Sequence, residues 1–154
     1  MEEMKRALES ALESQKQTMP ELIGSEKQIK WAEDIRETAI SCLDCIARNT
    51  AIAGRNLDGT VESYKELTEE RKATLEEIKK MRAALTQLIG SETSAATIID
   101  KRNKLTQDSI EKCIKNIVKI RMAAAADPEN ERGKKAIEML DGDYTAAVKK
   151  MLAW

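Results

Sequence analysis

Apolar residues recur along most of this 154-residue chain at alternating steps of three and four, which is the spacing of amphipathic helices. No segment shows the period-two alternation typical of strands. The segments with helical spacing are 2–16, 25–52, 60–89, 93–125 and, as two short C-terminal helices within 129–153, 129–140 and 143–153. We therefore predict an all-α fold: a single domain over 1–154 that forms an elongated helical bundle with a long helical hairpin arm.

The helix predicted over 25–52 has the clearest start in the chain. Ser25 followed by Gln28 forms a capping box, in which each side chain bonds the backbone N–H of the other residue. Gly24 allows a sharp turn before the cap, and Pro20 disfavours helical geometry at the preceding residue. Two apolar stripes run along this helix, so we expect it to be the central one, ending at the glycine-containing segment 53–59.

The helix predicted over 60–89 is the longest, opening at Thr60 and ending at Gly90 as its C-cap. Its apolar positions follow a heptad seam, interrupted by two polar residues: Tyr64, Leu67, Arg71, Thr74, Ile78, Met81, Leu85 and Leu88. We interpret it as an antiparallel hairpin arm with a solvated charged face. A binding surface, or a homodimer formed through residues 64–88, is the alternative.

The remaining predicted helices are separated by recognisable breaks. Asp127-Pro128 reads as a turn with proline at the first helical position, and Asp141-Gly142-Asp143 reads as a break between two short helices. The segment LIGSE occurs twice, at 22–26 and 88–92. Little else matches between the two halves, so shared helix-boundary signals explain the echo better than a duplication.

Composition narrows the class of protein. Charged residues make up 34% of the chain and the formal net charge is −1, which gives no global electrostatic reason to bind nucleic acid. No apolar run approaches the length of a membrane span, and the N-terminus lacks the apolar core of a signal peptide. We expect a cytoplasmic protein of a bacterial host that has no membrane partner.

Candidate catalytic chemistry is sparse. Cys42, Cys45 and Cys113 are an odd number of thiols, and the C-x-x-C pair lies within a predicted helix, so we interpret them as structural. The chain has no histidine and no glycine-rich phosphate loop. We therefore expect neither an enzyme, nor a metal site, nor a cofactor.

Two blocks carry a resemblance. MPELIGSEKQIKWAEDIR, residues 19–36 of the signature stretch 18–36, resembles a block L-P-x-L-x-G-S-E-K-Q-x-x-W-A-E-x-I-R found in uncharacterised proteins of phages and mobile elements of Firmicutes and gut bacteria. Residues 93–102 resemble that family's second block, T-D-A-x-W-W-I-D-x-R, with Thr97 and Ile98 in place of the aromatics. The family has no established activity, so the resemblance implies a phage or mobile-element origin and no mechanism.

From this origin and the missing catalytic groups we expect a non-catalytic protein-binding module. Its concrete form would be a stoichiometric, anti-CRISPR-like inhibitor of a host-defence protein such as a CRISPR effector nuclease. The expected contact residues lie in the first block and on the long helix: Lys27, Lys30, Trp31, Asp34, Arg36, Glu69, Glu70, Arg71, Glu76 and Glu77. For Trp31, a place in the core is favoured over an exposed anchor, because an indole on an apolar stripe is usually buried.

Two alternatives remain. The first is an accessory nucleic-acid-binding protein that uses a basic face of the 93–125 region, through Lys101, Arg102, Lys104, Lys112, Lys115, Lys119 and Arg121. Nearby acidic residues dilute this face. The second is a scaffold that homodimerises along the heptad seam.

Overall fold

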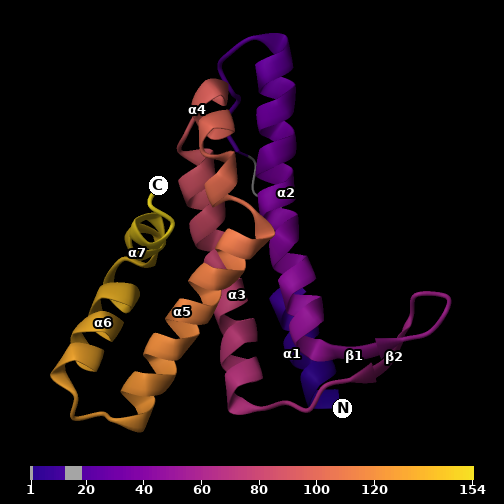
Figure 1. The fold of residues 1–154 in the computed structure, drawn as a ribbon, viewed down its shortest axis with the longest axis vertical. Helices are drawn as coiled ribbons and strands as arrows, with labels where there is room; N and C mark the ends of the chain where they lie inside the picture. Colours follow the sequence, from indigo (N-terminus) through magenta and orange to yellow (C-terminus); the bar gives the residue numbers. More distant parts are fainter. Residues whose placement is uncertain (1, 13–18) are drawn as a thin grey trace.

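The computed structural model describes residues 2–12 and 19–154 (Figure 1). In order, the elements are α1 (Glu2–Leu12), α2 (Glu26–Ala51), β1 (Ile52–Arg55), β2 (Val61–Tyr64), α3 (Glu69–Gly90), α4 (Ala95–Asp100), the 3₁₀ turn η1 (Arg102–Lys104), α5 (Gln107–Ala126), α6 (Glu131–Gly142) and α7 (Tyr144–Met151). The prediction of a mainly α-helical bundle is confirmed. Residues 13–16 of the first predicted helix lie outside the described residues.

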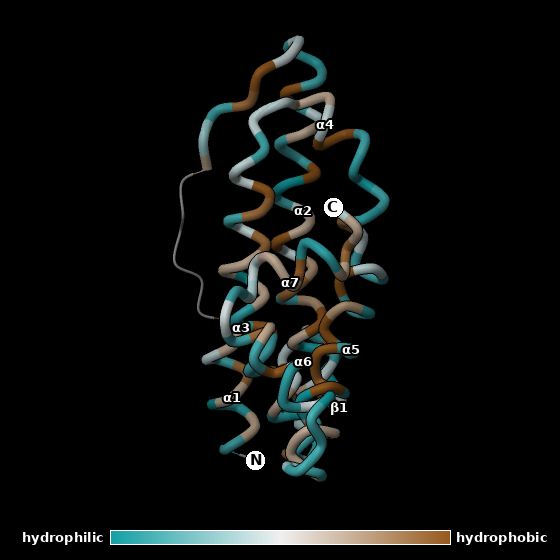
Figure 2. Tube along the Cα trace, turned by 90° about the vertical axis from the view of Figure 1, so that its left-hand side faces the viewer, coloured by the Kyte–Doolittle hydropathy of each residue, from teal (hydrophilic) through white to brown (hydrophobic). Residues whose placement is uncertain are grey.

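The helices pack around one hydrophobic cluster. Helix α2 runs antiparallel to α3, and α3 also packs on α1, α5 and α7 (Figure 1). Hydrophilic and hydrophobic positions alternate along the helices, as expected for amphipathic helices (Figure 2). The largest fully buried side chains come from most of these elements and include Met4, Leu43, Ile78, Leu85, Ile98, Ile110 and Ile117. Among helices in the described part of the chain, none is long and apolar enough to cross a membrane.

A β-hairpin projects from the bundle where no strand was predicted (Figure 1). Strand β1 follows α2 without a loop and pairs antiparallel with β2, in the register Ile52↔Tyr64 and Arg55↔Val61, with irregularities at Gly54. Four-residue strands with such irregularities are too short to show a period of two. The expectation that the chain contains no strand is therefore wrong for 52–64.

Helix α3 begins at Glu69, whereas the sequence predicted that it begins at Thr60. Thr68 caps it by accepting a hydrogen bond from the backbone N–H of Arg71. The first two seam positions, Tyr64 and Leu67, precede the helix, so their heptad spacing is coincidental.

Helix α3 was predicted to form a hairpin arm, but it lies inside the helical bundle. Its seam residues Ile78, Met81, Leu85 and Leu88 are buried in the monomer, because four helices pack around α3. Gly90 is the last residue of α3 and not its C-cap, and it lies against the side chains of Met19 and Pro20. The segment that projects from the molecule is the hairpin (Figure 1).

The region 93–125 divides into α4, η1 and α5, because two residues cap new helices within it. Ser94 accepts a hydrogen bond from Thr97 N–H, and Thr106 accepts one from Ser109 N–H. Proline 128 is not the first residue of α6: Asn130 caps that helix, which starts at Glu131. The predicted break at 141–143 is present, and the Asp143 carboxylate caps α7 by accepting from Ala146 N–H.

Candidate functional site

The two sequence blocks of the resemblance meet at one end of the molecule, where α4 lies beside the N-terminal end of α2 (Figure 1). The backbone N–H of Ile23 donates to the carbonyl of Thr93 at 2.7 Å, and Ala95 N–H donates to the carbonyl of Ile23 at 2.9 Å. Together they form a parallel bridge between segments about 70 residues apart. Gly24 permits this approach, because a Cβ at this position would come within 3.0 Å of the Ala95 Cβ.

Arg36 fastens this junction from inside. Its guanidinium donates to the carbonyls of Pro20 and Glu92, each at 2.8 Å, and reaches the carbonyl of Ile89 at 3.5 Å. The side chain is only 7% exposed, and burial lowers its pKa. The expectation that Arg36 contacts a partner is therefore wrong: this residue ties the first block to the segment that follows α3.

Trp31 is on the surface, with 50% of its area exposed, so the favoured place in the core is wrong. Both predicted apolar stripes of α2 contribute to the core, Ala39 from the stripe that contains Trp31 and Leu43 from the other, but Trp31 itself does not face the core. The guanidinium carbon of Arg102 lies 5.3 Å from the centre of the Trp31 ring, within cation–π range.

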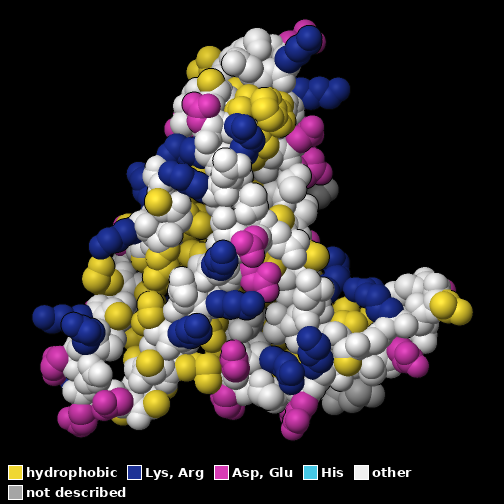
Figure 3. All heavy atoms as spheres, viewed as in Figure 1, with side chains coloured by type: hydrophobic (Ala, Val, Ile, Leu, Met, Phe, Trp, Pro, Cys, Tyr) yellow, Lys and Arg dark blue, Asp and Glu magenta, His cyan; other side chains and the backbone are white. Residues whose placement is uncertain are grey.

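The residues around Trp31 form one exposed face. Lys27 and Asp34 stand four and three positions from Trp31, which places them on the same side of α2. Lys30 stands beside both of them, three positions from Lys27 and four from Asp34, and all three charged residues are exposed. We call these four residues, together with Arg102 and Ile23, the junction surface. Figure 3 shows hydrophobic side chains gathered beside α4 and the upper end of α2, with charged side chains around them.

Ile23 was not predicted as a contact residue. It is 73% exposed at the bridge between the two blocks. Its backbone bonds to Thr93 and Ala95 hold it outside regular helix. No local pattern could indicate this position, because a single parallel bridge depends on a segment far away in the sequence.

The seven cations of the predicted basic face do not share one surface. Lys101 donates to the carbonyl of Trp154 and lies 4.5 Å from the centre of its ring, while Lys104 donates to the carbonyl of Ala153. Arg102 belongs to the junction surface. These three cations follow α4, Lys101 directly and the others within η1, and they already have partners within the chain.

On α5, Lys112, Lys115 and Lys119 are exposed, and the spacing places them along one side of the helix. Lys112 pairs with Asp108 at 3.1 Å, and Lys115 pairs with Glu111 at 3.2 Å. What remains of the predicted basic face is thus a short row of lysines, two of which have acidic neighbours.

Glu77 is an interior residue, so its predicted partner contact is wrong. Arg121, predicted as a nucleic-acid contact, is partly buried against it, with 19% of its side chain exposed. Glu77 is 1% exposed, pairs with Arg121 and accepts a hydrogen bond of 2.7 Å from the hydroxyl of Tyr144. Arg121 also pairs with Asp141 at 3.2 Å. Burial and the adjacent Glu77 carboxylate raise the pKa of Tyr144. This cluster joins α3 to α5, α6 and α7.

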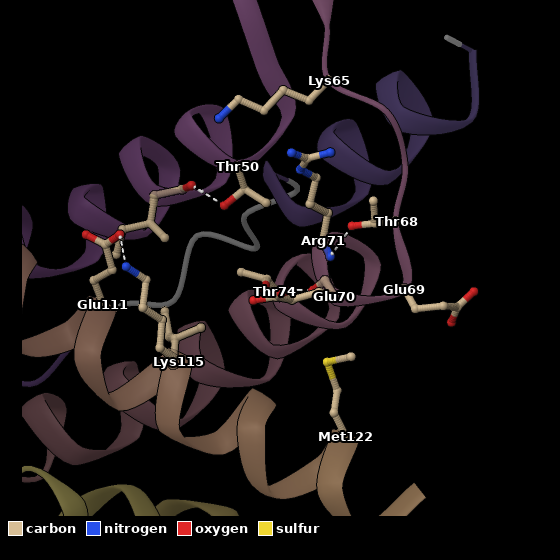
Figure 4. Close-up of a pocket in the computed structure, with 12 residues that line it drawn as sticks. Thr50, Lys65, Thr68, Glu69, Glu70, Arg71, Thr74, Glu111, Lys115 and Met122 are labelled. Atoms are coloured by element: carbon tan, nitrogen blue, oxygen red, sulfur yellow. Dashed lines mark hydrogen bonds and ion pairs between the residues drawn. The ribbon is translucent and has the colours of Figure 1, made fainter. Parts of the chain in front are cut away.

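The other acidic and basic contact residues predicted on α3 lie away from the junction surface. Glu69, Glu70 and Arg71 line an open pocket of about 660 Å³ between α2, α3 and α5 (Figure 4). Glu76 is exposed further along α3. Because α2 and α3 are antiparallel, the start of α3 is at the opposite end of the molecule from Trp31 (Figure 1).

The polar groups of this pocket bond mainly within their own segments. Thr50 donates to the carbonyl of Ile46 at 2.8 Å and Thr74 to that of Glu70 at 2.8 Å. Arg71 donates to the carbonyl of Glu66 at 2.7 Å. These three side chains therefore already have hydrogen-bond partners within the chain.

The three cysteines are free thiols. Cys42 and Cys113 are buried, which raises the pKa of Cys42 and brings that of Cys113 to about 11, while Cys45 is exposed. Within residues 2–12 and 19–154, no group of three histidine, cysteine, aspartate or glutamate residues is placed to hold a metal ion.

Comparison with known proteins adds no relative: no family model, no curated protein and no solved structure matches this chain. The evidence for function therefore comes from the junction surface itself.

Proposed function

We propose that this protein is a non-catalytic binding module that docks on a protein partner through the junction surface. The observation that carries the proposal is the half-exposed Trp31 with Arg102 against its ring. Tryptophan and arginine are the residues most enriched among those that dominate the binding energy of protein interfaces.

The construction of this surface supports the same reading. The backbone hydrogen bonds of Ile23 hold α2 and α4 together beneath the exposed side chains. The hydrogen bonds from the Arg36 guanidinium to three carbonyls add to this. A surface that is already rigid loses little conformational entropy on binding. Ile23 adds a second exposed hydrophobic side chain to the indole.

The concrete form of the proposal is a stoichiometric inhibitor of a host-defence protein, such as a CRISPR effector nuclease. The resemblance of residues 19–36 to a block of phage and mobile-element proteins motivates it. Most of the junction surface comes from that block. An inhibitor of this kind needs a docking surface and no catalytic group.

Nucleic-acid binding ranks second. Around Trp31, the three cations Lys27, Lys30 and Arg102 are offset by three acidic side chains of α2 and α4: Glu33, Asp34 and Asp100. A surface that contacts phosphates needs a net positive charge. If nucleic acid were nevertheless the ligand, its affinity would fall steeply between 50 and 200 mM salt, by roughly a thousandfold or more for six or more phosphate contacts.

A homodimerising scaffold ranks third. Four apolar seam residues between 64 and 88 (Ile78, Met81, Leu85 and Leu88) are buried within the monomer. A dimer through that seam would have to open the bundle first.

The test is a plasmid-interference assay in the bacterium that carries the gene, with the co-resident defence systems expressed one at a time. The wild-type protein should restore plasmid transfer against one system and form a 1:1 complex with a component of it. Trp31→Ala should lower the affinity at least about tenfold, which corresponds to about 1.4 kcal/mol. Met139→Ala is the matched control, because Met139 is an exposed hydrophobic residue on α6.

Two outcomes would count against the proposal. If no co-resident system is affected, the inhibitor form is wrong. If a complex forms and Trp31→Ala binds as tightly as Met139→Ala, the docking surface lies elsewhere.

A further inference from the structure

The β-hairpin 52–64 is a separate feature of the structure that takes no part in the junction surface. It projects from the C-terminal end of α2 (Figure 1), whereas Trp31 lies near the start of that helix, which begins at Glu26. Its two strands have four residues each, and the loop between them carries a fully exposed leucine side chain, Leu57.

The loop that carries Leu57 is held by its own hydrogen bonds. Asn56 N–H donates to the carbonyl of Thr60 at 2.8 Å, and Gly59 N–H donates to the carbonyl of Asn56 at 3.0 Å. The side-chain amide of Asn56 donates to the Thr60 hydroxyl at 3.0 Å. Gly59 has φ of +88°, a left-handed conformation that glycine adopts without strain.

Charged side chains brace the same turn. One carboxylate oxygen of Asp58 accepts from both the backbone N–H and the hydroxyl of Thr60, at 3.0 and 2.6 Å, and these bonds lower the pKa of Asp58. Arg55 donates across the turn to the carbonyl of Gly59 at 3.0 Å. Arg55 of β1 and four residues of the loop (Asn56, Asp58, Gly59 and Thr60) thus hold its shape, whereas Leu57 contributes only an exposed apolar side chain.

The base of the hairpin is fixed to the bundle. Strand β1 continues directly from α2, and Lys65 N–H donates to the carbonyl of Ala51 at 2.7 Å. The side chains of Ile52 and Tyr64 pack against the hydrophobic core. The direction of the hairpin is therefore set by α2.

A single exposed leucine is common on protein surfaces and indicates nothing alone. Leu57 differs because a rigid, anchored protrusion holds it away from the bundle, so a partner can bury it with little loss of conformational entropy. We propose that the hairpin tip is a second docking element, which inserts Leu57 into an apolar pocket of the protein partner.

The chemistry of the hairpin selects a protein as the occupant. Its charged residues are Arg55, Asp58 and Glu62, a net negative set that phosphate groups would repel. A convex tip with one apolar side chain fits a concave apolar pocket. Twenty helical steps along α2 separate Trp31 from Ala51, a rise of about 30 Å, so a partner that meets both docking elements must present two sites at least that far apart.

This inference rests on the proposed function in one respect, because both require a protein partner. Two photocrosslinking variants separate them: benzoylphenylalanine in place of Leu57, and the same residue in place of Ile23. Each purified variant is irradiated in a lysate of the bacterium that carries the gene, and the crosslinked protein and peptide are identified. Unlabelled competitors measure the contribution of the leucine: wild type, Leu57→Asn, and Met139→Asn as the matched control.

We expect the Leu57 probe to label one protein saturably, on a peptide that borders an apolar pocket, and the Ile23 probe to label the same protein. Leu57→Asn should need at least about ten times the concentration of wild type to compete for the Leu57 crosslink, whereas Met139→Asn should compete like wild type. Labelling from Ile23 alone, or equal competition by Leu57→Asn, overturns the second docking element and leaves the junction surface intact. Labelling from Leu57 alone supports the hairpin and overturns the junction surface. Crosslinks from Leu57 only to a second copy of this chain, or only to nucleic acid, overturn the inference.

Discussion

Arg36→Ala tests how the two sequence blocks are held together. In the wild type, the guanidinium donates to the carbonyls of Pro20 and Glu92 at 2.8 Å, and only 7% of the residue is exposed. Hydrogen bonds from a charged donor contribute about 1.5–3 kcal/mol each. The third contact, to Ile89 at 3.5 Å, adds little, because this carbonyl also accepts from the backbone.

The two short bonds together give an expected loss of about 3–5 kcal/mol in the free energy of unfolding. The assay is urea denaturation followed by circular dichroism, with the slope of the transition checked for two-state behaviour. Arg36→Lys should recover part of the loss, because an ammonium can reach one carbonyl and cannot span two. Arg48→Ala is the control on the same helix: Arg48 is exposed, so the change should stay within about 0.5 kcal/mol.

Hydrogen exchange locates the effect. The amides of Ile23 and Ala95 bond across the junction, so in Arg36→Ala they should exchange faster than in wild type even where the rest of the bundle is unchanged. A loss below about 1 kcal/mol, with protection at these two amides unchanged, would refute the reasoning that Arg36 fastens the blocks.

Three further predictions concern exposure and burial. Trp31→Ala should stay folded and lose less than about 2 kcal/mol by urea denaturation, because half of the residue is exposed, whereas a loss of 3–5 kcal/mol would indicate a core residue. In the native protein, a thiol reagent at pH 8 should modify Cys45 first, with Cys42 and Cys113 reacting only on unfolding, and equal rates for all three would contradict this burial. The contribution of Cys113 to stability should be constant up to about pH 9 and then fall: the pKa of Cys113 rises from 9.0 to about 11 on folding, so the unfolded chain loses that proton first, and Tyr144 shifts in the same direction. Denaturation midpoints between pH 8 and 11 measure this fall, and Cys113→Ala should reduce it.

The two sequence blocks that carry the resemblance lie in contact in the structure. The fold brings the blocks 19–36 and 93–102 into contact through Ile23 and Arg102, and Arg36 bonds Glu92 directly before the second block. Within the second block, Ile98 is fully buried. Part of what the blocks encode is therefore the joint between α2 and α4, and part is the exposed face around Trp31.

Local interactions explain what the sequence by itself determined. The capping box at Ser25 and Gln28 is present, and helical spacing located most of the helices, because caps and amphipathic stripes involve neighbouring residues. The same local signals failed at 60–68, where helix-like spacing crosses strand β2 and the cap is Thr68.

Only the tertiary structure decided which groups are available to a partner. Trp31 and Glu77 both stand on helices with mixed surfaces, yet one is exposed and the other is 1% exposed against Arg121 and Tyr144. Which stripe of a helix faces the core depends on the helices that pack on it, and those come from distant parts of the chain. The same holds for the parallel bridge at Ile23 and for the direction of the hairpin that carries Leu57.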